Sequence, residues 1–389
     1  MKAVILLSAK NRKLYPFTES VPKCLINIAG TAIVDSLLQR LKSVEVNEVL
    51  FIVNDRKQLV SEHIGHNQKY RPNISYVDYE TVEQIPDVLA SVKDFLKSET
   101  TFKTYPKYAV AAIAHPPVSG HYHAVYINSE MGISKVEHSA LSEKPANYVL
   151  AGAFVLSVSA LERIEAHHFN IYSYFNELAA DNGFRICIWE DLWIDIKYPW
   201  DILNANRMIM DTWTHSSIAS SAVLEKEVYI KGPVIIGENV RICSGTSIIG
   251  PCFIGDNTFI GNNVLIREYA NIGADSSIGY GTEIKNAAIF GNVKIGRLSF
   301  IGDSVLGFNV NFGSCSMTIN YNTSGEPVIF QSPDKSVETQ FEKLGAFIGD
   351  GASVGSNHSI MPGLVIRPGY PIPDHITVDS RIYAKPDNV

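Results

Sequence analysis

The chain has 389 residues, of which 46% are hydrophobic and 19% are charged. This composition excludes an intrinsically disordered chain, and the length predicts two domains. The formal net charge of −7 argues against nucleic acid or an anionic membrane as the partner, because both favour a basic face.

Cysteine usage and the lack of targeting segments point to the compartment. The N-terminus lacks the layout of a signal peptide, and no apolar run reaches the roughly 18 residues that span a bilayer. The five cysteines are spread out without a C-x-x-C pair: Cys24, Cys187, Cys243, Cys252 and Cys315. We therefore expect free thiols in a reducing cytoplasm rather than disulfides or a zinc site.

An apolar run at Ala3–Leu7 predicts the first strand, and the loop SAKNRKLYPFT, residues 8–18, follows it directly. A loop after a strand is a common place for a phosphate to bind, but this loop has no glycine. Its cations, with one more shortly after it, are Lys10, Arg12, Lys13 and Lys23. Two interpretations stay open: a loop that binds an anion, and a solvated basic loop.

The rest of the first half alternates between strand and helix patterns. Further strand candidates are Glu48–Val53, Tyr108–Ala114, Ala124–Asn128 and Tyr148–Leu156. Helical patterns cover Ile33–Ser43, Pro86–Leu96, Ser159–Ala166 and Ile171–Asp181, and a last one at Pro199–Trp213 would lead into the second half. This alternation predicts an α/β domain with a mostly parallel sheet and helices on its faces.

The second half repeats every six residues. Isoleucine occupies every sixth position from Ile236 to Ile284, and after a one-residue slip the series resumes at Ile289 and Ile295. Glycine often follows directly, as at Gly237 and Gly255. A six-residue period fits neither an amphipathic helix nor an alternating strand, and it predicts a parallel β-helix with one aliphatic residue inward per side.

One segment, Asn320–Lys343, interrupts this period. An excursion of this length from a regular solenoid is either a surface loop or a lid over a site. The sequence does not distinguish the two.

Motifs in both halves carry a resemblance to a known family. They are the loop residues Leu14, Pro16, Thr18, Pro22 and Lys23, the Glu-Lys-Pro at 143–145, the W-x-D-I-x-x-P-x-D at 193–201 and the hexapeptide repeats. With them the chain resembles the sugar-1-phosphate nucleotidylyltransferases that end in a left-handed β-helix, in particular the archaeal-type and bacterial bifunctional nucleotidylyltransferase/acetyltransferases. The resemblance implies a Rossmann-like nucleotidyltransferase domain over residues 1–212 and a left-handed parallel β-helix over residues 213–389.

On the nucleotide side, the resemblance maps the family's triphosphate loop onto residues 8–23. Ala9 stands at a glycine position and, with Arg12, is expected to contact substrate, whereas Lys13 and Lys23 would be catalytic. Lys13 replaces an arginine, so the charge remains but the planar two-pronged donor is lost. The family's base-reading loop has become Asp78–Ile85.

On the sugar side, the resemblance assigns sugar hydroxyls to Glu143 and a sugar phosphate to Lys144, with Gly152 in the expected place. Asp195 would hold a Mg²⁺ ion. Its usual partner in the family is an Asp in a strand that ends in Gly-Asp, after the helix that here covers Pro86–Leu96, and we find no Gly-Asp pair there. Nucleotide-side features are therefore altered while the sugar side is retained.

The β-helix shows a comparable loss. The positions that in the family contact an amino-sugar phosphate or shape the acetyl-CoA site are Arg267, Lys285, Asn311, Asn320, Tyr321 and Lys343. The family's general-base histidine is Arg297 here, which stays protonated and cannot accept a proton from an amine. Phe300 also lacks the hydroxyl of the usual tyrosine. We interpret the site as a vestigial acetyltransferase site.

Three hypotheses follow, in this order. The first is a sugar-1-phosphate nucleotidylyltransferase that uses a nucleoside triphosphate and Mg²⁺, with activity weak or lost. The second is a catalytically silent regulatory subunit that binds a sugar phosphate or a nucleotide sugar. The third is a hexapeptide-repeat acyltransferase with another base. By analogy, β-helices of this type pack into homotrimers.

Overall fold

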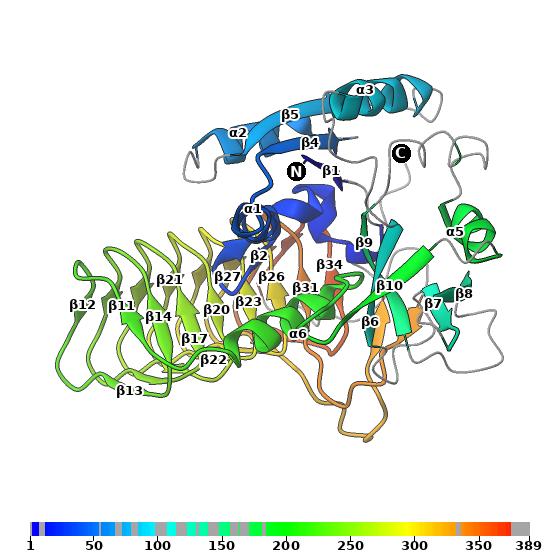
Figure 1. Cartoon of the computed structure of the whole chain (residues 1–389). Helices are drawn as coiled ribbons and strands as arrows, with labels where there is room; N and C mark the ends of the chain where they lie inside the picture. The colour runs from blue at the N-terminus through cyan, green and yellow to red at the C-terminus, as the bar shows by residue number, and fades with distance from the viewer. Residues whose placement is uncertain are drawn as a thin grey trace. The chain divides into compact units, whose positions relative to one another are not determined.

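The computed structural model describes residues 2–7, 12–53, 56–66, 72–78, 85–97, 107–113, 123–129, 132–138, 148–155, 163, 171–180, 184–331 and 336–374 (Figure 1). The chain divides into two compact units. The first contains Met1–Leu6, Glu45–Ile52 and Arg71–Asp195, and the second contains Leu7–Val44, Val53–Tyr70 and Ile196–Val389. The domain boundary between residues 212 and 213 stays a prediction.

In the first unit, a three-stranded sheet has the order β1 (Lys2–Leu7), β4 (Glu48–Val53), β5 (Asn73–Asp78). The central strand is buried by its run of apolar residues, and Leu50 packs with Val88 and Val92 of α3 (Ile85–Lys97). Lys2 lies 3.1 Å from Glu48 and donates a hydrogen bond to the carbonyl of Phe95. The apolar spacing of α3 thus places one face of this helix on the sheet.

A second sheet of this unit has the order β10 (Phe184–Trp189), β6 (Lys107–Ile113), β9 (Tyr148–Val155), β7 (His123–Ile127), β8 (Ile133–His138). Only the β10–β6 pair is parallel, and the other three pairs are antiparallel. The prediction of a mostly parallel sheet is wrong for these five strands. The physical reason is the tight connection between β7 and β8, where the amide of Asn128 donates to the carbonyl of Gly132, because a short connection joins only antiparallel strands.

Helix α5 (Ile171–Ala180) covers this sheet with Tyr174 and Phe175, both fully buried. The sequence missed β5, β8, β10 and α2 (Lys57–His66). Among the residues of α2 whose burial the structure describes, only Val60 and Ile64 are buried. The apolar stripe of the helix is therefore too narrow for its period to be recognised from the sequence. Of the predicted helix at Ser159–Ala166, all residues but 163 lie outside the described part of the chain.

The second unit contains the β-helix, whose strands pair in parallel in three sheets (Figure 1). The first sheet contains β11 (Ser217–Ile218), β14 (Val234–Ile236), β17 (Cys252–Ile254), β20 (Asn271–Ile272), β23 (Ala288–Ile289), β26 (Val305–Leu306), β31 (Phe347–Ile348) and β34 (Val365–Ile366). The second contains β12 (Val223–Leu224), β15 (Arg241–Ile242), β18 (Phe259–Ile260), β21 (Ser277–Ile278), β24 (Lys294–Ile295), β27 (Asn311–Phe312), β32 (Ser353–Val354) and β35 (Pro371–Ile372). The third contains β13 (Tyr229–Lys231), β16 (Ser247–Ile249), β19 (Leu265–Ile266), β22 (Glu283–Lys285), β25 (Phe300–Gly302), β28 (Met317–Thr318) and β33 (Ser359–Ile360).

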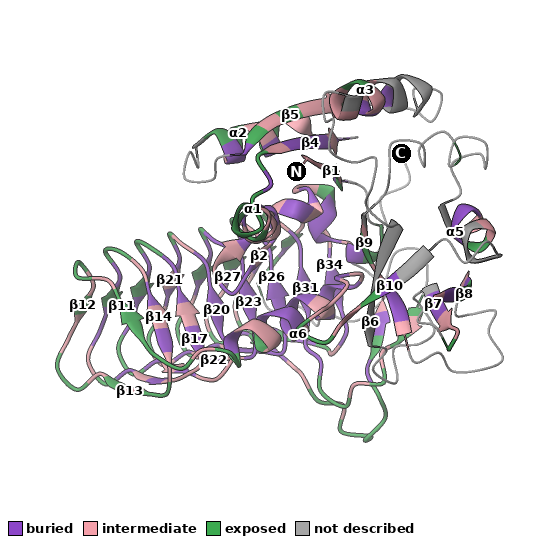
Figure 2. Ribbon diagram, viewed as in Figure 1, coloured by how far each residue is buried: buried purple, intermediate pink, exposed green. Residues whose placement is uncertain are grey.

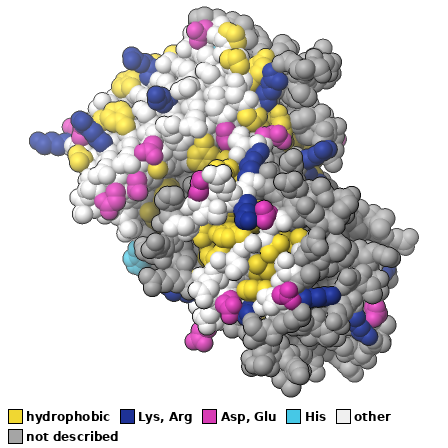
Figure 3. All heavy atoms as spheres, turned by 90° about the horizontal axis from the view of Figure 1, so that it is seen from above, with side chains coloured by type: hydrophobic (Ala, Val, Ile, Leu, Met, Phe, Trp, Pro, Cys, Tyr) yellow, Lys and Arg dark blue, Asp and Glu magenta, His cyan; other side chains and the backbone are white. Residues whose placement is uncertain are grey.

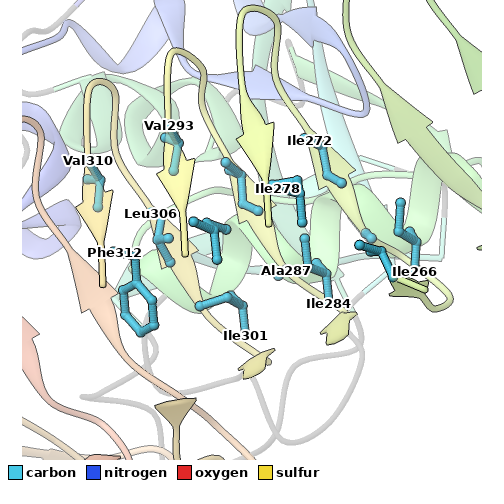
Figure 4. Close-up of a cluster of buried hydrophobic side chains, with 14 of the residues drawn as sticks. Ile266, Ile272, Ile278, Ile284, Ala287, Val293, Ile301, Leu306, Val310 and Phe312 are labelled. Atoms are coloured by element: carbon cyan, nitrogen blue, oxygen red, sulfur yellow. The ribbon is translucent and has the colours of Figure 1, made fainter. Parts of the chain in front are cut away.

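The six-residue repeat places its isoleucines in the interior of these coils. Ile260 pairs with Ile278 and Ile278 with Ile295 on successive coils, and Ile266 and Ile284 are fully buried in the same core (Figure 4). Each coil thereby stacks its branched side chains on those of the next coil. The predicted left-handed parallel β-helix is confirmed as the fold of this half.

We name the turns after the first, second and third sheets the first, second and third corners. At the first corner a residue with positive φ recurs on successive coils, among them Asn239, Asn257, Asn292 and Asn309. Asparagine tolerates this conformation and its side chain can pair locally. Asn239 donates to Asn257 at 3.2 Å, and Asn292 donates to Asn309 at 2.6 Å. The corner is thus stabilised by a ladder of amide side chains.

The outer face of the first sheet is covered by an early part of the chain and by α6 (Pro199–Met210) (Figure 2). The early part contains η1 (Arg12–Leu14), η2 (Phe17–Glu19), η3 (Lys23–Leu25), β2 (Asn27–Ile28), β3 (Thr31–Ala32) and α1 (Ile33–Ser43). Phe17 is fully buried, with its ring centroid 5.2 Å from that of Phe290. Asn206 of α6 accepts hydrogen bonds from the amide of Ala29 at 2.7 Å and from Asn271 at 3.2 Å.

The excursion from the repeat begins and ends in a bridge between Tyr321 and Lys343. It contains an antiparallel hairpin of β29 (Ile329–Gln331) and β30 (Ser336–Glu338). Phe330 anchors the hairpin, because its buried ring lies 5.2 Å from Trp200 and 5.3 Å from Phe347. The segment is therefore packed against α6 and the first sheet.

Candidate functional site

The loop after β1 presents its cations from a buried apolar base. Leu14 and Phe17 are fully buried, whereas Arg12 and Lys13 are exposed and Lys23 is half-buried. Lys13 Nζ lies 5.8 Å from the centroid of the Tyr198 ring, within reach of a cation–π interaction. Arg12, Lys13 and Lys23 thus sit on a short stretch fixed by its apolar residues. Ala9 lies outside the described residues.

The segment that carries Asp195 is joined to β9. The indole N–H of Trp193 donates to the carbonyl of Ala151 at 3.2 Å. The next residue, Gly152, has φ +79° and lies where the register of β9 against β6 shifts between Ala109 and Ala111. A positive φ at a bulge is readily adopted by glycine. The structure thereby brings the Asp195 segment beside Gly152, while Glu143 and Lys144 lie outside the described residues.

The last aspartate of the same motif has a structural role that the sequence did not reveal. Asp201 accepts hydrogen bonds from the amides of Lys197 at 2.8 Å and Tyr198 at 2.7 Å. These amides precede the first turn of α6, where backbone N–H groups lack partners in the helix. Asp201 therefore caps α6, and the sequence signal for it was Pro199 at the start of a helix with an acid in its first turn.

Asp195 is half-buried and could supply one carboxylate to a metal ion. In the described part of the chain, no group of three or more His, Cys, Asp or Glu side chains is placed to hold a metal. Mg²⁺ commonly binds one or two carboxylates and completes its shell with waters and substrate phosphates. A single carboxylate such as that of Asp195 would fit a Mg²⁺ ion that is shared with substrate phosphates.

At the third corner of the β-helix, two of the predicted cations stack on successive coils. The amide of Arg267 donates to the carbonyl of Ile284, beside Lys285, at 2.8 Å. Arg267 Nη1 lies 3.0 Å from Glu283 Oε1, and both side chains are more than one-third exposed. An ion pair so open to water contributes little to stability, so the pair leaves Arg267 and Lys285 able to meet an anion.

A buried carboxylate lies at the same corner. The Asp303 carboxylate accepts a hydrogen bond from the side-chain amide of Asn286 at 2.6 Å and another from the side-chain amide of Asn320. A Cβ on Gly302 would lie 2.5 Å from the ring of Phe300, so this ring folds over the glycine next to Asn320. The sequence identified Asn320 but missed Asn286 and Asp303, which only their stacking on adjacent coils brings together.

Two of the other predicted acetyltransferase residues, Arg297 and Asn311, lie apart from this corner. Arg297 is exposed in the second corner, after β24, and Asn311 is exposed on β27 of the second sheet. Tyr321 and Lys343 pair at the base of the excursion. One copy of the chain thus gathers Arg267, Lys285 and Asn320, with Tyr321 following, but not Arg297.

The histidine closest in sequence to this region is not a replacement base. His358 is 1% exposed, and its Nε2 lies 2.7 Å from the carbonyl oxygen of Pro373. A buried imidazole bonded to the backbone is a packing residue.

Charge on the surface agrees with the composition. On the face drawn in Figure 3, basic and acidic side chains are interspersed over the part of the molecule that the structure describes. No helix of the described residues is long and apolar enough to cross a membrane.

The fold and the motif segments define a nucleotidyltransferase domain joined to a β-helix. The family description Nucleotidyl transferase matches residues 2–111, and that of the GMPPB C-terminal domain matches residues 248–333. A relative from Methanococcus maripaludis strain C5, "Bifunctional protein GlmU", is 30% identical over 98% of this chain and 95% of its own length. Relatives from Methanocaldococcus jannaschii, with the same name, and from Sulfurisphaera tokodaii, "Bifunctional sugar-1-phosphate nucleotidylyltransferase/acetyltransferase", are each 28% identical over 94% of this chain, and over 92% and 94% of their own lengths. The chain belongs to this family of bifunctional nucleotidylyltransferase/acetyltransferases, which supports its assignment as a nucleotidyltransferase of nucleotide-sugar synthesis.

Proposed function

We propose that this protein joins a nucleoside triphosphate to a sugar 1-phosphate, forming a nucleotide sugar and pyrophosphate. The observation that carries the proposal is the family match from end to end of the chain, with Lys13, Lys23 and Asp195 at the motif positions. The half-buried Lys23 and the exposed Lys13 present two cations from a loop with a rigid apolar base. Such fixed charges are what a site that stabilises developing phosphate charge requires.

In the proposed reaction, a phosphate oxygen of the sugar 1-phosphate attacks the α-phosphorus of the triphosphate. A new P–O bond forms while the bond to the leaving pyrophosphate breaks, and the negative charge passes to the pyrophosphate. Lys13 and Lys23 stabilise this charge, and Arg12 attracts the triphosphate. Glu143 and Lys144 would hold the sugar hydroxyls and the sugar phosphate. Asp195 would hold Mg²⁺, which supplies neutralising charge on the phosphates when bound.

A second candidate is a catalytically silent regulatory subunit that binds a sugar phosphate or a nucleotide sugar. The observation that favours it is that, within the nucleotidyltransferase domain, groups on the nucleotide side are altered whereas the sugar-side motif residues are retained. Lys13 cannot offer the planar, two-pronged donor geometry of an arginine. The loop also has no glycine, so its backbone N–H groups cannot approach a triphosphate closely. In contrast, Gly152 and the corner of Arg267 and Lys285 are retained.

The acyltransferase hypothesis ranks last. Arg297 is exposed and stays protonated, so it cannot serve as the general base. His358 is sequestered by its contact with Pro373. We expect no acetyl transfer.

The test is release of pyrophosphate from each nucleoside triphosphate with Mg²⁺ and a panel of sugar 1-phosphates. Turnover that is lost in Asp195→Ala and Lys13→Ala, but kept in the surface control Lys231→Ala, supports the enzyme. No turnover with any pair, together with measurable binding of a sugar phosphate or nucleotide sugar, supports the silent subunit. Free CoA thiol formed from acetyl-CoA and glucosamine 1-phosphate would support the acyltransferase instead.

We also propose a cytoplasmic homotrimer formed through the β-helix. Large apolar side chains on the second and third sheets and the corner between them are exposed in one copy, among them Phe259, Tyr280, Leu298 and Met317. Exposed apolar surface of this kind commonly marks an interface. Light scattering combined with size-exclusion chromatography would measure the mass, and a monomer would contradict the proposal.

A further inference from the structure

The segment between Lys13 and Lys23 rests on the first corner of the β-helix. Phe17 packs on Phe290, whose ring lies 5.4 Å from that of Phe308 on the next coil. Asp350 follows Phe308 one coil further on, because the amide of Gly351 donates to the carbonyl of Phe308 at 2.7 Å. A column of corner residues from separate coils thus forms the surface under the loop.

Two polar side chains hold this segment. Arg56 donates through Nη1 to the carbonyl of Thr18 at 3.5 Å and through Nη2 to the carbonyl of Glu19. The Asp350 carboxylate lies within hydrogen-bonding reach of the Ser20 hydroxyl, and its Oδ1 accepts a hydrogen bond from the amide of Phe308 at 2.9 Å. The two side chains thereby hold three consecutive residues midway between Lys13 and Lys23.

The backbone conformation of Arg56 and the burial of Asp350 both show that surrounding contacts hold these two residues in place. Arg56 has φ +51°, a left-handed conformation that is unfavourable for a residue other than glycine or asparagine. Such strain persists only where surrounding contacts fix it. Burial raises the pKa of Asp350 to about 6, against the opposing effects of the Phe308 amide, Ser20 and Arg56. The loop segment therefore covers the carboxylate closely enough to remove much of its water.

We propose that Arg56 and Asp350 are positioning residues that hold the loop Arg12–Lys23 in the geometry that binds the triphosphate. This role rests on the proposed nucleotidylyltransferase function. Neither side chain needs to touch the substrate. They act through the backbone at Thr18 and Glu19 and through Ser20, so that the two lysines on either side keep their spacing.

The β-helix offers a matched control for Asp350. Asp256 lies at the same corner and accepts the amide of Glu238 at 2.7 Å, as Asp350 accepts the amide of Phe308. Each carboxylate also lies above a glycine of the preceding coil, because a Cβ on Gly237 or Gly307 would meet its Oδ1 at 2.1 or 2.0 Å. Asp256 is exposed and accepts no loop hydroxyl among the described contacts.

Hydrogen exchange of the full chain tests the positioning without requiring activity. Asp350→Ala and Arg56→Ala are expected to speed amide exchange in residues 14–25 by roughly tenfold, with the coils around Ile284 unchanged. Asp350→Asn, which keeps an acceptor for Ser20, is expected to restore protection, and Asp256→Ala to leave the loop as in the wild type. If the amides of the loop exchange equally fast in Asp350→Ala and Asp256→Ala, Asp350 only accepts the backbone amide of the preceding coil, as Asp256 does, and the proposal is overturned.

Kinetics separate a positioning role from a general loss of fold. In the pyrophosphate assay, Asp350→Ala is expected to raise KM for the triphosphate by about tenfold, with KM for the sugar 1-phosphate unchanged. An equal rise in both, or a fall in kcat alone, would contradict the assignment to the triphosphate loop. If the wild type releases no pyrophosphate with any substrate pair, the proposed function fails. The exchange of residues 14–25 then decides by itself whether Arg56 and Asp350 hold the loop.

Discussion

Replacing Asp350 by asparagine should stabilise the protein, and the gain should depend on pH. The pKa of Asp350 is raised from 3.8 to about 6, chiefly by burial. The folded protein therefore holds this proton more tightly than the unfolded chain. The free energy of unfolding must fall as the pH rises through the window from about 4 to about 6. A difference of about two pKa units corresponds to about 3 kcal/mol at most.

Asparagine has nearly the same shape as aspartate and keeps one acceptor for Ser20 or the Phe308 amide, but it has no proton to lose. Asp350→Asn is expected to match the wild type near pH 4 and to exceed its stability by up to about 3 kcal/mol at pH 7 and above. Urea unfolding at intervals between about pH 4 and pH 8 measures this difference. Asp256→Asn, at an exposed position of the same corner, serves as the control. A gain that is the same at all pH values, or a loss at pH 7, would refute the reasoning.

Three further predictions concern the packing of the second unit. Ile284 is fully buried, so Ile284→Ala should lower the free energy of unfolding by about 2–5 kcal/mol, and a change below about 1 kcal/mol in urea titrations would place the residue outside the core. A Cβ on Gly273 would meet the carbonyl oxygen of Phe290 at 2.0 Å, whereas Gly369 has open space but φ +68°. Gly273→Ala should therefore cost about 4 kcal/mol or more and Gly369→Ala about 1–2 kcal/mol, and thermal melting that ranks them the other way contradicts the packing. Phe17→Ala should cost about 3–5 kcal/mol and make the adjacent loop more sensitive to limited proteolysis, and unchanged cleavage would show that its contact with Phe290 does not hold the loop.

The sequence was sufficient to propose the residues of the candidate site from their motifs, but it did not show which contacts their side chains make. Lys13, Lys23 and Asp195 are predicted site residues because each belongs to a short pattern of neighbouring residues. Asp201 was taken as part of the same pattern, and the structure shows that its carboxylate caps α6. The prediction that Arg297 is not a general base rests on the residue type alone, because a guanidinium stays protonated in a protein.

The sequence by itself determined the β-helix. Each coil repeats one inward aliphatic residue every six positions, and each coil packs mainly on its neighbours in the chain, so the pattern needs no distant contact to be recognised. The strands β1, β4 and β9 and the helix α1 were likewise found from local apolar periodicity.

Only the tertiary structure decided which unit contains the proposed triphosphate loop. Residues Leu7–Val44 belong with the β-helix, because Phe17 packs on Phe290 and because Ser20 lies within hydrogen-bonding reach of Asp350. These partners lie some 270 and 330 positions apart in the chain, and no local period links them. A corner of a solenoid brings such residues together only after its coils have stacked, so the surface under the loop is a property of the folded chain and not of any segment.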